Sequence, residues 1–120
     1  MDNIEIGKLG EEIATKYLKR HGYKILERNF RSKRWGEIDI VATKDDVLVF
    51  VEVKARIGSK YGQPVEAVTP YKLQALKRTG QYYVMEHPDL PEALRIDVVA
   101  IVLDKETHSP LKIDLFFDAQ

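Results

Sequence analysis

Two β-forming runs joined by a turn-prone cluster restrict the fold of this chain more than any other feature. GEIDIVAT, residues 36–43, and VLVFVEVKA, residues 47–55, are rich in β-branched and apolar residues, and the run KDD separates them. Apolar runs on either side of such a cluster are typical of a β-hairpin. If Asp45 and Asp46 are the two central turn residues, the pairing register of both strands is fixed.

This register places charged side chains opposite one another on one face of the hairpin. Asp39 lies opposite Glu52 and Glu37 lies opposite Lys54, because side chains of a strand alternate between its two faces. Val41 and Phe50 share this face. The other face is expected to be apolar core, formed by Ile38, Ile40, Val51 and Val53.

The opposed carboxylates of Asp39 and Glu52 need compensation. They repel each other, and burial beside apolar neighbours adds a desolvation cost of several kcal/mol per ion. Lys54 supplies one positive charge, for which Glu37 competes. A divalent cation such as Mg2+ would balance the rest, because it binds carboxylate oxygens and retains waters that can react. The alternative is a solvent-facing sheet surface on which these four charges form cross-strand ion pairs.

Two helices are predicted outside the hairpin. Residues 4–21 place apolar side chains on one stripe at about 100° per residue, and Gly22 ends this helix. Glu11 falls roughly 95° from the centre of the stripe and is a candidate third carboxylate, although an ordinary flanking acid would occupy the same position. The second helix begins with Thr69 as its N-cap and ends at His87.

Three more strands are expected at residues 23–31, 95–103 and 111–117, the last at an edge of the sheet. The order is helix, three strands, helix, two strands, with no internal repeat. These elements predict an α/β fold in which helices flank a mixed five-stranded sheet. The whole chain, residues 1–120, is expected to form a single domain, long enough to bury roughly two thirds of its unfolded surface.

Composition excludes several classes of protein. The chain has no cysteine, so disulfides, thiolate zinc sites and cysteine nucleophiles are excluded. Its three histidines are far apart in sequence, which disfavours a histidine metal site. No apolar run approaches the roughly 18 residues of a membrane span, and the first 18 residues lack the features of a signal peptide. We therefore expect no membrane association and a cytoplasmic location.

The net charge of zero conceals an uneven distribution. Residues 16–34 hold eight Lys or Arg against one Glu, whereas residues 86–120 hold three basic residues against eight acidic ones. A local basic patch can bind a phosphate backbone. A solvated helix face followed by a polar loop explains the same charges without any ligand.

Three segments together resemble a known nuclease superfamily. Glu11 on a helix, Asp39 in GEIDIV and the Glu-Val-Lys at 52–54 resemble the PD-(D/E)xK superfamily, which has the restriction-endonuclease-like fold. Ile38 stands where the nominal proline of that motif would be. Up to about Tyr83 the chain is also similar to the uncharacterised bacterial YraN-type family, and the runs that carry this resemblance are GEEIATKYLKRHGY, RNFRSKRWGEIDIVA, VFVEVKAR and YGQPVEAVTPYK. The fold of that family is similar to that of archaeal Holliday junction resolvases.

The resemblance implies roles for individual residues. Asp39 and Glu52 would bind Mg2+ or Mn2+, and the Val53 carbonyl and Glu11 would complete the metal shell. Lys54 would activate or orient the attacking water. By analogy with junction resolvases, the resemblance also suggests branched or otherwise structured DNA as substrate and a homodimer as the assembly.

Hydrolysis of a phosphodiester fits these residues independently, because it needs a positioned water and stabilisation of developing negative charge. Six basic residues are candidates for holding backbone phosphates: Arg31, Lys33, Arg34, Arg56, Lys60 and Lys72. Lys72 lies in the first turn of its helix, where a cation is unfavourable, which hints at an anionic contact. Trp35 is expected at the rim of the core, with base stacking as the alternative.

The sequence therefore predicts a Mg2+-dependent nuclease, or nuclease-like protein, that acts on DNA. A non-catalytic nucleic-acid-binding protein that retains the fold is the alternative. A scaffold protein that binds partners through its acidic C-terminal third is a third option, and its DNA binding would be absent or insensitive to salt.

Overall fold

The computed structural model describes residues 1–58 and 69–119 and confirms the predicted α/β fold. The chain order is α-β-β-β-α-β-β, as expected. The elements are α1 (Asn3–Arg20), β1 (Lys24–Ser32), β2 (Gly36–Lys44), β3 (Val47–Ile57), α2 (Pro70–Glu86), β4 (Leu94–Leu103) and β5 (Pro110–Phe116).

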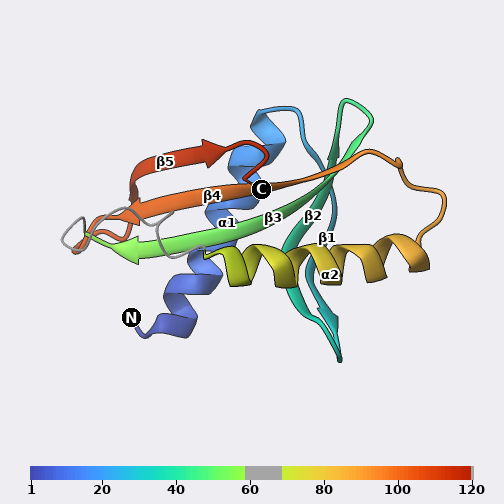
Figure 1. Cartoon of the computed structure of the whole chain (residues 1–120). Helices are drawn as coiled ribbons and strands as arrows, with labels where there is room; N and C mark the ends of the chain where they lie inside the picture. The colour runs from blue at the N-terminus through green and yellow to red at the C-terminus, as the bar shows by residue number, and fades with distance from the viewer. Residues whose placement is uncertain (59–68, 120) are drawn as a thin grey trace.

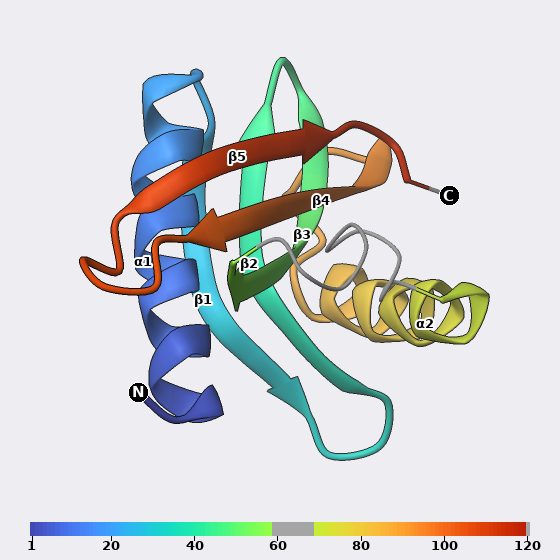
Figure 2. The same ribbon diagram turned by 90° about the vertical axis from the view of Figure 1, so that its left-hand side faces the viewer.

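The strands form one five-stranded sheet in the order β1-β2-β3-β4-β5 (Figure 1). The β3–β4 pair is parallel and the other pairs are antiparallel, so the sheet is mixed, with β5 at one edge as predicted. Figure 2 shows α1 and α2 on opposite sides of the sheet. In the part of the chain that the structure describes, no helix has the length and apolar character needed to cross a bilayer.

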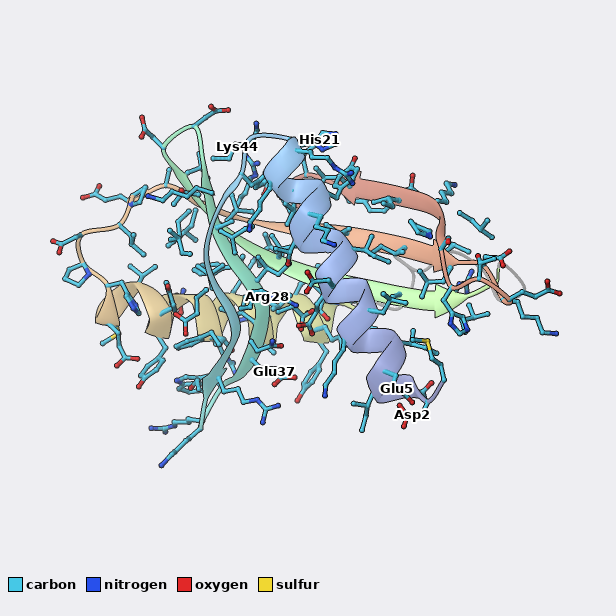
Figure 3. All side chains as sticks on the ribbon, turned by 180° about the vertical axis from the view of Figure 1, so that it is seen from behind. Asp2, Glu5, His21, Arg28, Glu37 and Lys44 are labelled. Atoms are coloured by element: carbon cyan, nitrogen blue, oxygen red, sulfur yellow. The ribbon has the colours of Figure 1, made fainter. Side chains whose placement is uncertain are left out.

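α1 has specific signals at both ends. Asp2 is its N-cap, and the Asp2 and Glu5 side chains form a reciprocal capping box with bonds of 2.8 and 3.3 Å (Figure 3). Beyond the last turn, Gly22 has a φ of +87°, a left-handed conformation that glycine adopts without strain. At this end Lys44 of β2 donates a 2.7 Å hydrogen bond to the His21 carbonyl. The sequence placed the helix within one residue of its bounds.

The hairpin has the predicted register. Lys44 pairs with Val47, and the ladder continues to the pair Ile40–Val51. Asp45 has a φ of 49° and Asp46 a φ of 61°, which are the positive values needed at both central positions of a tight two-residue turn. Aspartate tolerates this conformation better than most residues.

The two faces of the sheet bury separate apolar cores. One core lies between α1 and the sheet and includes Leu18, Ile40 and Val51. The other lies between α2 and the sheet and includes Phe50 and Leu76. Burial on both faces explains why the central strands read as nearly continuous apolar runs.

The predicted grouping of β2 side chains is wrong at Ile38. Ile38 packs with Val41 and Phe50 in the core under α2, whereas Ile40 packs under α1. Residues 38 and 41 are three positions apart, so strict alternation fails between them. Asn29, which lies between the pairs Arg28–Ile40 and Phe30–Ile38, has a φ of 56°, and this irregularity breaks the pleat next to Asp39.

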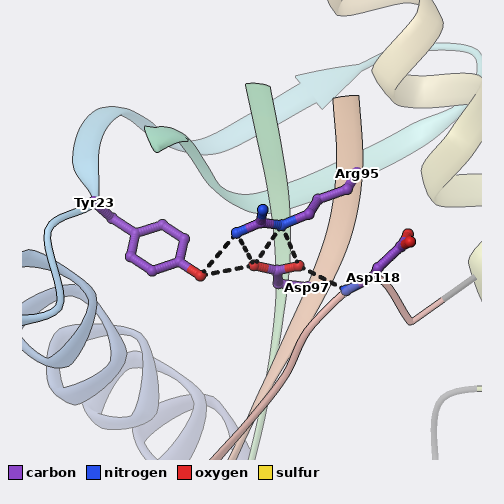
Figure 4. Close-up of polar contacts among 4 residues, drawn as sticks. All are labelled: Tyr23, Arg95, Asp97 and Asp118. Atoms are coloured by element: carbon purple, nitrogen blue, oxygen red, sulfur yellow. Dashed lines mark hydrogen bonds and ion pairs between the residues drawn. The ribbon is translucent and has the colours of Figure 1, made fainter. Parts of the chain in front are cut away.

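A buried polar cluster on β4 was not anticipated from the sequence (Figure 4). The Asp97 carboxylate is fully buried and accepts hydrogen bonds from the Tyr23 hydroxyl at 2.9 Å and from Arg95 Nε at 3.0 Å. It also accepts the Asp118 backbone N–H at 2.9 Å, which ties the C-terminal segment to the sheet. Because all of these partners are donors, the buried charge is well satisfied.

Glycine 80 lets α2 approach the sheet closely, and its replacement gives a clear prediction. A Cβ at this position would lie 2.5 Å from Phe50 Cε2 and 2.8 Å from Cδ2. Gly80→Ala should therefore destabilise the fold by roughly 1–3 kcal/mol, because the clash outweighs the gain in helix propensity. Urea denaturation followed by circular dichroism measures the change.

Gly7→Ala is the matched control, because a Cβ at Gly7 in α1 has no heavy atom within 4 Å. It should stabilise the protein by roughly 0.5–1 kcal/mol through helix propensity alone. Equal effects of the two substitutions would contradict the close packing of α2 on Phe50.

Candidate active site

The candidate site lies where β2 separates from β3. The β2–β3 ladder ends at Ile40–Val51, whereas β2 stays paired with β1 as far as Gly36 and β3 stays paired with β4 as far as Ile57. The ribbon formed by β1 and β2 therefore bends away from the rest of the sheet, as Figure 2 shows. Asp39 and Glu52 are the first residues beyond the last pair, one on each strand.

The Asp39 carboxylate occupies this fork. Its Oδ2 accepts the backbone N–H of Val53 at 2.8 Å, so a side chain satisfies a strand N–H at the point where the ladder ends. Burial, followed by repulsion from Glu52, raises the pKa of Asp39 from 3.8 to about 7. The Val53 hydrogen bond acts in the opposite direction, and Glu11 and Glu37 add smaller repulsions. Asp39 therefore gives up its proton only near neutral pH unless a cation is present.

Glu52 faces two lysines from different elements. Its Oε1 lies 3.6 Å from the Nζ of Lys54 on the same strand and 3.7 Å from the Nζ of Lys72 in the first turn of α2. The Glu52 side chain is only 13% exposed, so these contacts are weakly screened. Burial and the neighbouring Lys72 lower the pKa of Lys54, which makes it easier to deprotonate than an exposed lysine.

Both carboxylates line one pocket of about 220 Å3. Its walls come from β2, from β3 and from the face of α2 that looks toward the sheet. The lining residues are Trp35, Gly36, Glu37, Asp39, Glu52, Lys72, Ala75, Leu76 and Thr79. The predicted proximity of Asp39 and Glu52 thus corresponds to an accessible hollow between the sheet and α2.

Glu11 lies apart from this pocket. It lines a second pocket of about 500 Å3, and its Oε1 is 3.9 Å from Nη2 of Arg28 on β1. Across residues 1–58 and 69–119, no three histidine or acidic side chains cluster closely enough to hold a metal ion. Glu11 raises the pKa of Asp39 through its charge, and its role as a third ligand stays a prediction.

The predicted partner of Glu37 is wrong. Glu37 does not compete for Lys54, since its Oε2 lies 3.0 Å from Nε of Arg31 on the neighbouring strand β1. The β1–β2 register places Arg31 directly opposite Glu37, whereas β3 has already diverged at this point. The divergence of the strands therefore leaves Lys54 to Glu52.

The six phosphate-binding candidates have different surroundings. Lys33 and Arg34 are exposed in the turn between β1 and β2, and Arg31 precedes them on β1. Arg56 is half-buried on β3, and Lys60 lies outside the described residues. The anionic contact suggested for Lys72 is the protein's own Glu52, which gives an intramolecular reason for a cation in the first turn of α2.

Sequence reasoning missed Arg78 and Thr79 of α2, which lie beside the site. Thr79 lines the pocket of the two carboxylates, and the Arg78 guanidinium lies 5.8 Å from the centre of the Trp35 ring. The helical period offered a signal, because Lys72, Leu76 and Thr79 recur at i, i+4 and i+7 and therefore share a face. Trp35 itself is half-buried and lines the pocket, and the position at the rim of the core stays a prediction.

The residues present fit a hard divalent cation. Asp39 and Glu52 offer carboxylate oxygens to one pocket, and the raised pKa of Asp39 shows that two negative charges there are unfavourable without a further cation. Mg2+ is often held by one or two carboxylates and keeps several waters, so a third protein ligand is not required.

Comparison with known proteins identifies the family. A model of the uncharacterised protein family UPF0102 matches residues 10–101. The chain belongs to this family. A UPF0102 protein of Syntrophomonas wolfei is 48% identical over 85% of this chain and 88% of its own length. A UPF0102 protein of Caldicellulosiruptor saccharolyticus is 44% identical, and the match covers 99% of each chain. These matches confirm the family that the sequence resembled.

The raised pKa of Asp39 predicts how stability changes with pH in the metal-free protein. The Asp39 carboxyl binds its proton more tightly in the folded protein, where its pKa is about 7, than in the unfolded chain, where it is 3.8. The contribution of this residue to stability is therefore complete below pH 3.8 and is lost as the pH rises through 7. Asp39→Asn keeps an acceptor for Val53 and removes the charge. At about pH 8 the variant should be more stable than the wild type by roughly 2–4 kcal/mol.

Urea denaturation in EDTA across the pH range measures this difference, which should shrink toward pH 4. Asp114→Asn on β5 makes the same chemical change away from the site and controls for the loss of one acid. If the free energies of unfolding of Asp39→Asn and the wild type differed by the same amount at every pH, the raised pKa of Asp39 would be refuted.

Proposed function

We propose that this protein is a Mg2+-dependent nuclease that hydrolyses phosphodiester bonds of DNA, with branched or otherwise structured DNA as the narrower substrate class. The observation that carries this proposal is the pair Asp39 and Glu52, which line one pocket from two diverging strands, with Lys54 Nζ 3.6 Å from Glu52 Oε1. The resemblance of these three residues to the PD-(D/E)xK pattern supports the same chemistry.

In this proposal each residue has a defined task. Asp39 and Glu52 would hold Mg2+, or Mn2+ in its place. The bound ion would supply a polarised phosphate oxygen and a water of lowered pKa. Lys54, which is held 3.6 Å from Glu52, would activate or orient the attacking water. Lys72 contacts Glu52 from the opposite wall of the pocket and adds positive charge where the transferring phosphoryl group would lie.

The surroundings of the pocket suit a polyanionic strand. The β1–β2 turn presents Lys33 and Arg34 in exposed positions, next to the pocket wall formed by Trp35. Contacts of this kind position a nucleic acid through its backbone and carry no sequence information. The proposed DNA substrate is consistent with a cytoplasmic location. The formation of a homodimer stays a prediction.

Cleavage assays on linear, nicked and four-way DNA, with and without Mg2+, test the proposal. The wild type should cleave at least one substrate only when Mg2+ or Mn2+ is present. Asp39→Asn and Glu52→Gln should reduce the rate by about 100-fold or more, because each removes a charged ligand worth several kcal/mol in the transition state. Lys54→Ala should reduce the rate without abolishing metal binding.

Asp114→Asn on β5 is again the control and should retain full activity. Failure of the wild type to cleave any of these substrates, under conditions in which it binds DNA and Mg2+, would reject the enzymatic proposal.

A non-catalytic nucleic-acid-binding protein is the second candidate, and one observation favours it. Glu52 already has two lysines within 4 Å, which offsets much of the negative charge of the pocket without a metal. In this case the carboxylates and lysines would stabilise the fold and take no part in catalysis.

Isothermal titration calorimetry separates the two candidates. A nuclease should show a heat of Mg2+ binding that disappears in Asp39→Asn. A non-catalytic protein should show no such heat, and Asp39→Asn should leave DNA affinity unchanged or raise it, because a negative charge is removed. Fluorescence anisotropy over a range of salt concentrations measures this affinity.

A further inference from the structure

Another pocket, distinct from the one that Glu11 lines, adjoins the pocket of Asp39 and Glu52, and Trp35 forms part of both. This pocket has a volume of about 310 Å3 and is lined by Trp35, Arg78, Gln81, Tyr82 and Met85. It lies between the β1–β2 turn and the C-terminal half of α2. We refer to it as the Trp35 pocket. Its volume is at the lower end of the range for small-molecule sites, roughly 300–1,000 Å3.

The side chains of the Trp35 pocket are unusual for a protein surface. Tyr82 is 37% exposed and Met85 is 80% exposed, so two large apolar groups face water beside a half-buried tryptophan. Phe30 supports the Tyr82 ring at a centroid distance of 6.3 Å. Gln81 adds an amide that can both donate and accept hydrogen bonds. Exposed aromatic and thioether side chains beside a hollow can contact a flat apolar group that enters it.

Two arginines lie beside the Trp35 ring, and one of them, Arg78, lines the Trp35 pocket, whereas Tyr82 of the lining is hydrogen-bonded to Glu86. The Arg34 guanidinium lies 5.0 Å from the centre of the Trp35 ring, and the Arg78 guanidinium lies 5.8 Å from it. Within residues 1–58 and 69–119, neither arginine forms an ion pair with a carboxylate. Both guanidinium groups lie beside the ring, where they can contact an anionic ligand that approaches it.

We propose that the Trp35 pocket binds an unstacked nucleobase of the DNA strand whose phosphate lies at Asp39 and Glu52. An aromatic platform, an amide and arginines beside the ring are the groups that bind a base by stacking, by its edge and by its phosphates. In a continuous duplex the bases are stacked on their neighbours and cannot enter such a pocket. The pocket thus selects substrates with unpaired nucleotides, such as single strands, flaps and branch points.

The inference rests on the proposed nucleic-acid substrate but does not require cleavage, so it is tested without a divalent metal. Trp35 is the single tryptophan of the chain, and its fluorescence reports directly on the pocket. In EDTA, a short single-stranded oligodeoxythymidylate should quench this fluorescence as it binds. An oligonucleotide of equal length built from abasic residues keeps the phosphates, so it should bind more weakly and leave the fluorescence largely unchanged.

Variants locate the effect. Trp35→Leu should lose about 10-fold in affinity for the oligodeoxythymidylate, measured by anisotropy of a labelled strand, and little for the abasic strand. Trp35→Phe should retain most of the affinity because it keeps an aromatic face. Met85→Ala changes an exposed side chain of the same pocket and should reduce affinity for the base-containing strand without disturbing the fold. Leu111→Ala, on exposed β5 at the opposite edge of the sheet from β1, should have no effect.

Equal binding of base-containing and abasic strands would overturn the base pocket while leaving the nuclease proposal intact. The same conclusion would follow if Trp35→Leu and Met85→Ala bound the base-containing strand as tightly as the wild type. Quenching by a base without any Mg2+-dependent cleavage would support the pocket and favour a non-catalytic binding protein. A blunt duplex of equal length should quench least, and quenching as strong as with the single strand would contradict the proposed selection.

Discussion

The hydrogen bond from the Val53 backbone to the Asp39 carboxylate is the contact on which the candidate site depends. Two strands that separate inside a sheet leave backbone groups without partners, and an unsatisfied buried N–H costs free energy. Asp39 supplies an acceptor at the fork, so β2 can leave β3 without that cost. The same placement keeps the carboxylate near Glu52, and burial and repulsion then raise its pKa. One interaction thus stabilises the fork and creates the charge imbalance that a cation would relieve.

The second wall of the site depends on how closely α2 lies on the sheet. Gly80 has no side chain where it faces the Phe50 ring, so the helix can pack against β3 at short range. This brings Lys72 of the first turn within 3.7 Å of Glu52 and brings Arg78 near Trp35. The carboxylate pocket and the Trp35 pocket therefore share one cause, which is the close contact between α2 and the sheet.

The two sheet faces handle buried charge differently. Asp97, under α1, is surrounded by donors from Tyr23, Arg95 and the backbone of Asp118, which leaves it satisfied within the protein. Asp39 instead has one backbone donor and several acidic neighbours. Buried acids with donors on every side are structural, whereas a strained acid that lines a pocket is a candidate for function.

The sequence alone determined the element order, the hairpin turn and the proximity of Asp39 and Glu52, because turn chemistry and the period of two are local properties. It also placed Lys54 on the same face as Glu52, whereas the contact between the two came from the structure. Tertiary structure alone decided that Ile38 joins the core under α2, that Glu37 pairs with Arg31, and that Glu11 stays outside the pocket. Strict alternation fails between Ile38 and Val41, and the β2–β3 ladder stops one residue before the site. Which charges meet beyond that point depends on the bend of the β1–β2 ribbon and on the packing of α2, and neither is encoded in a local pattern.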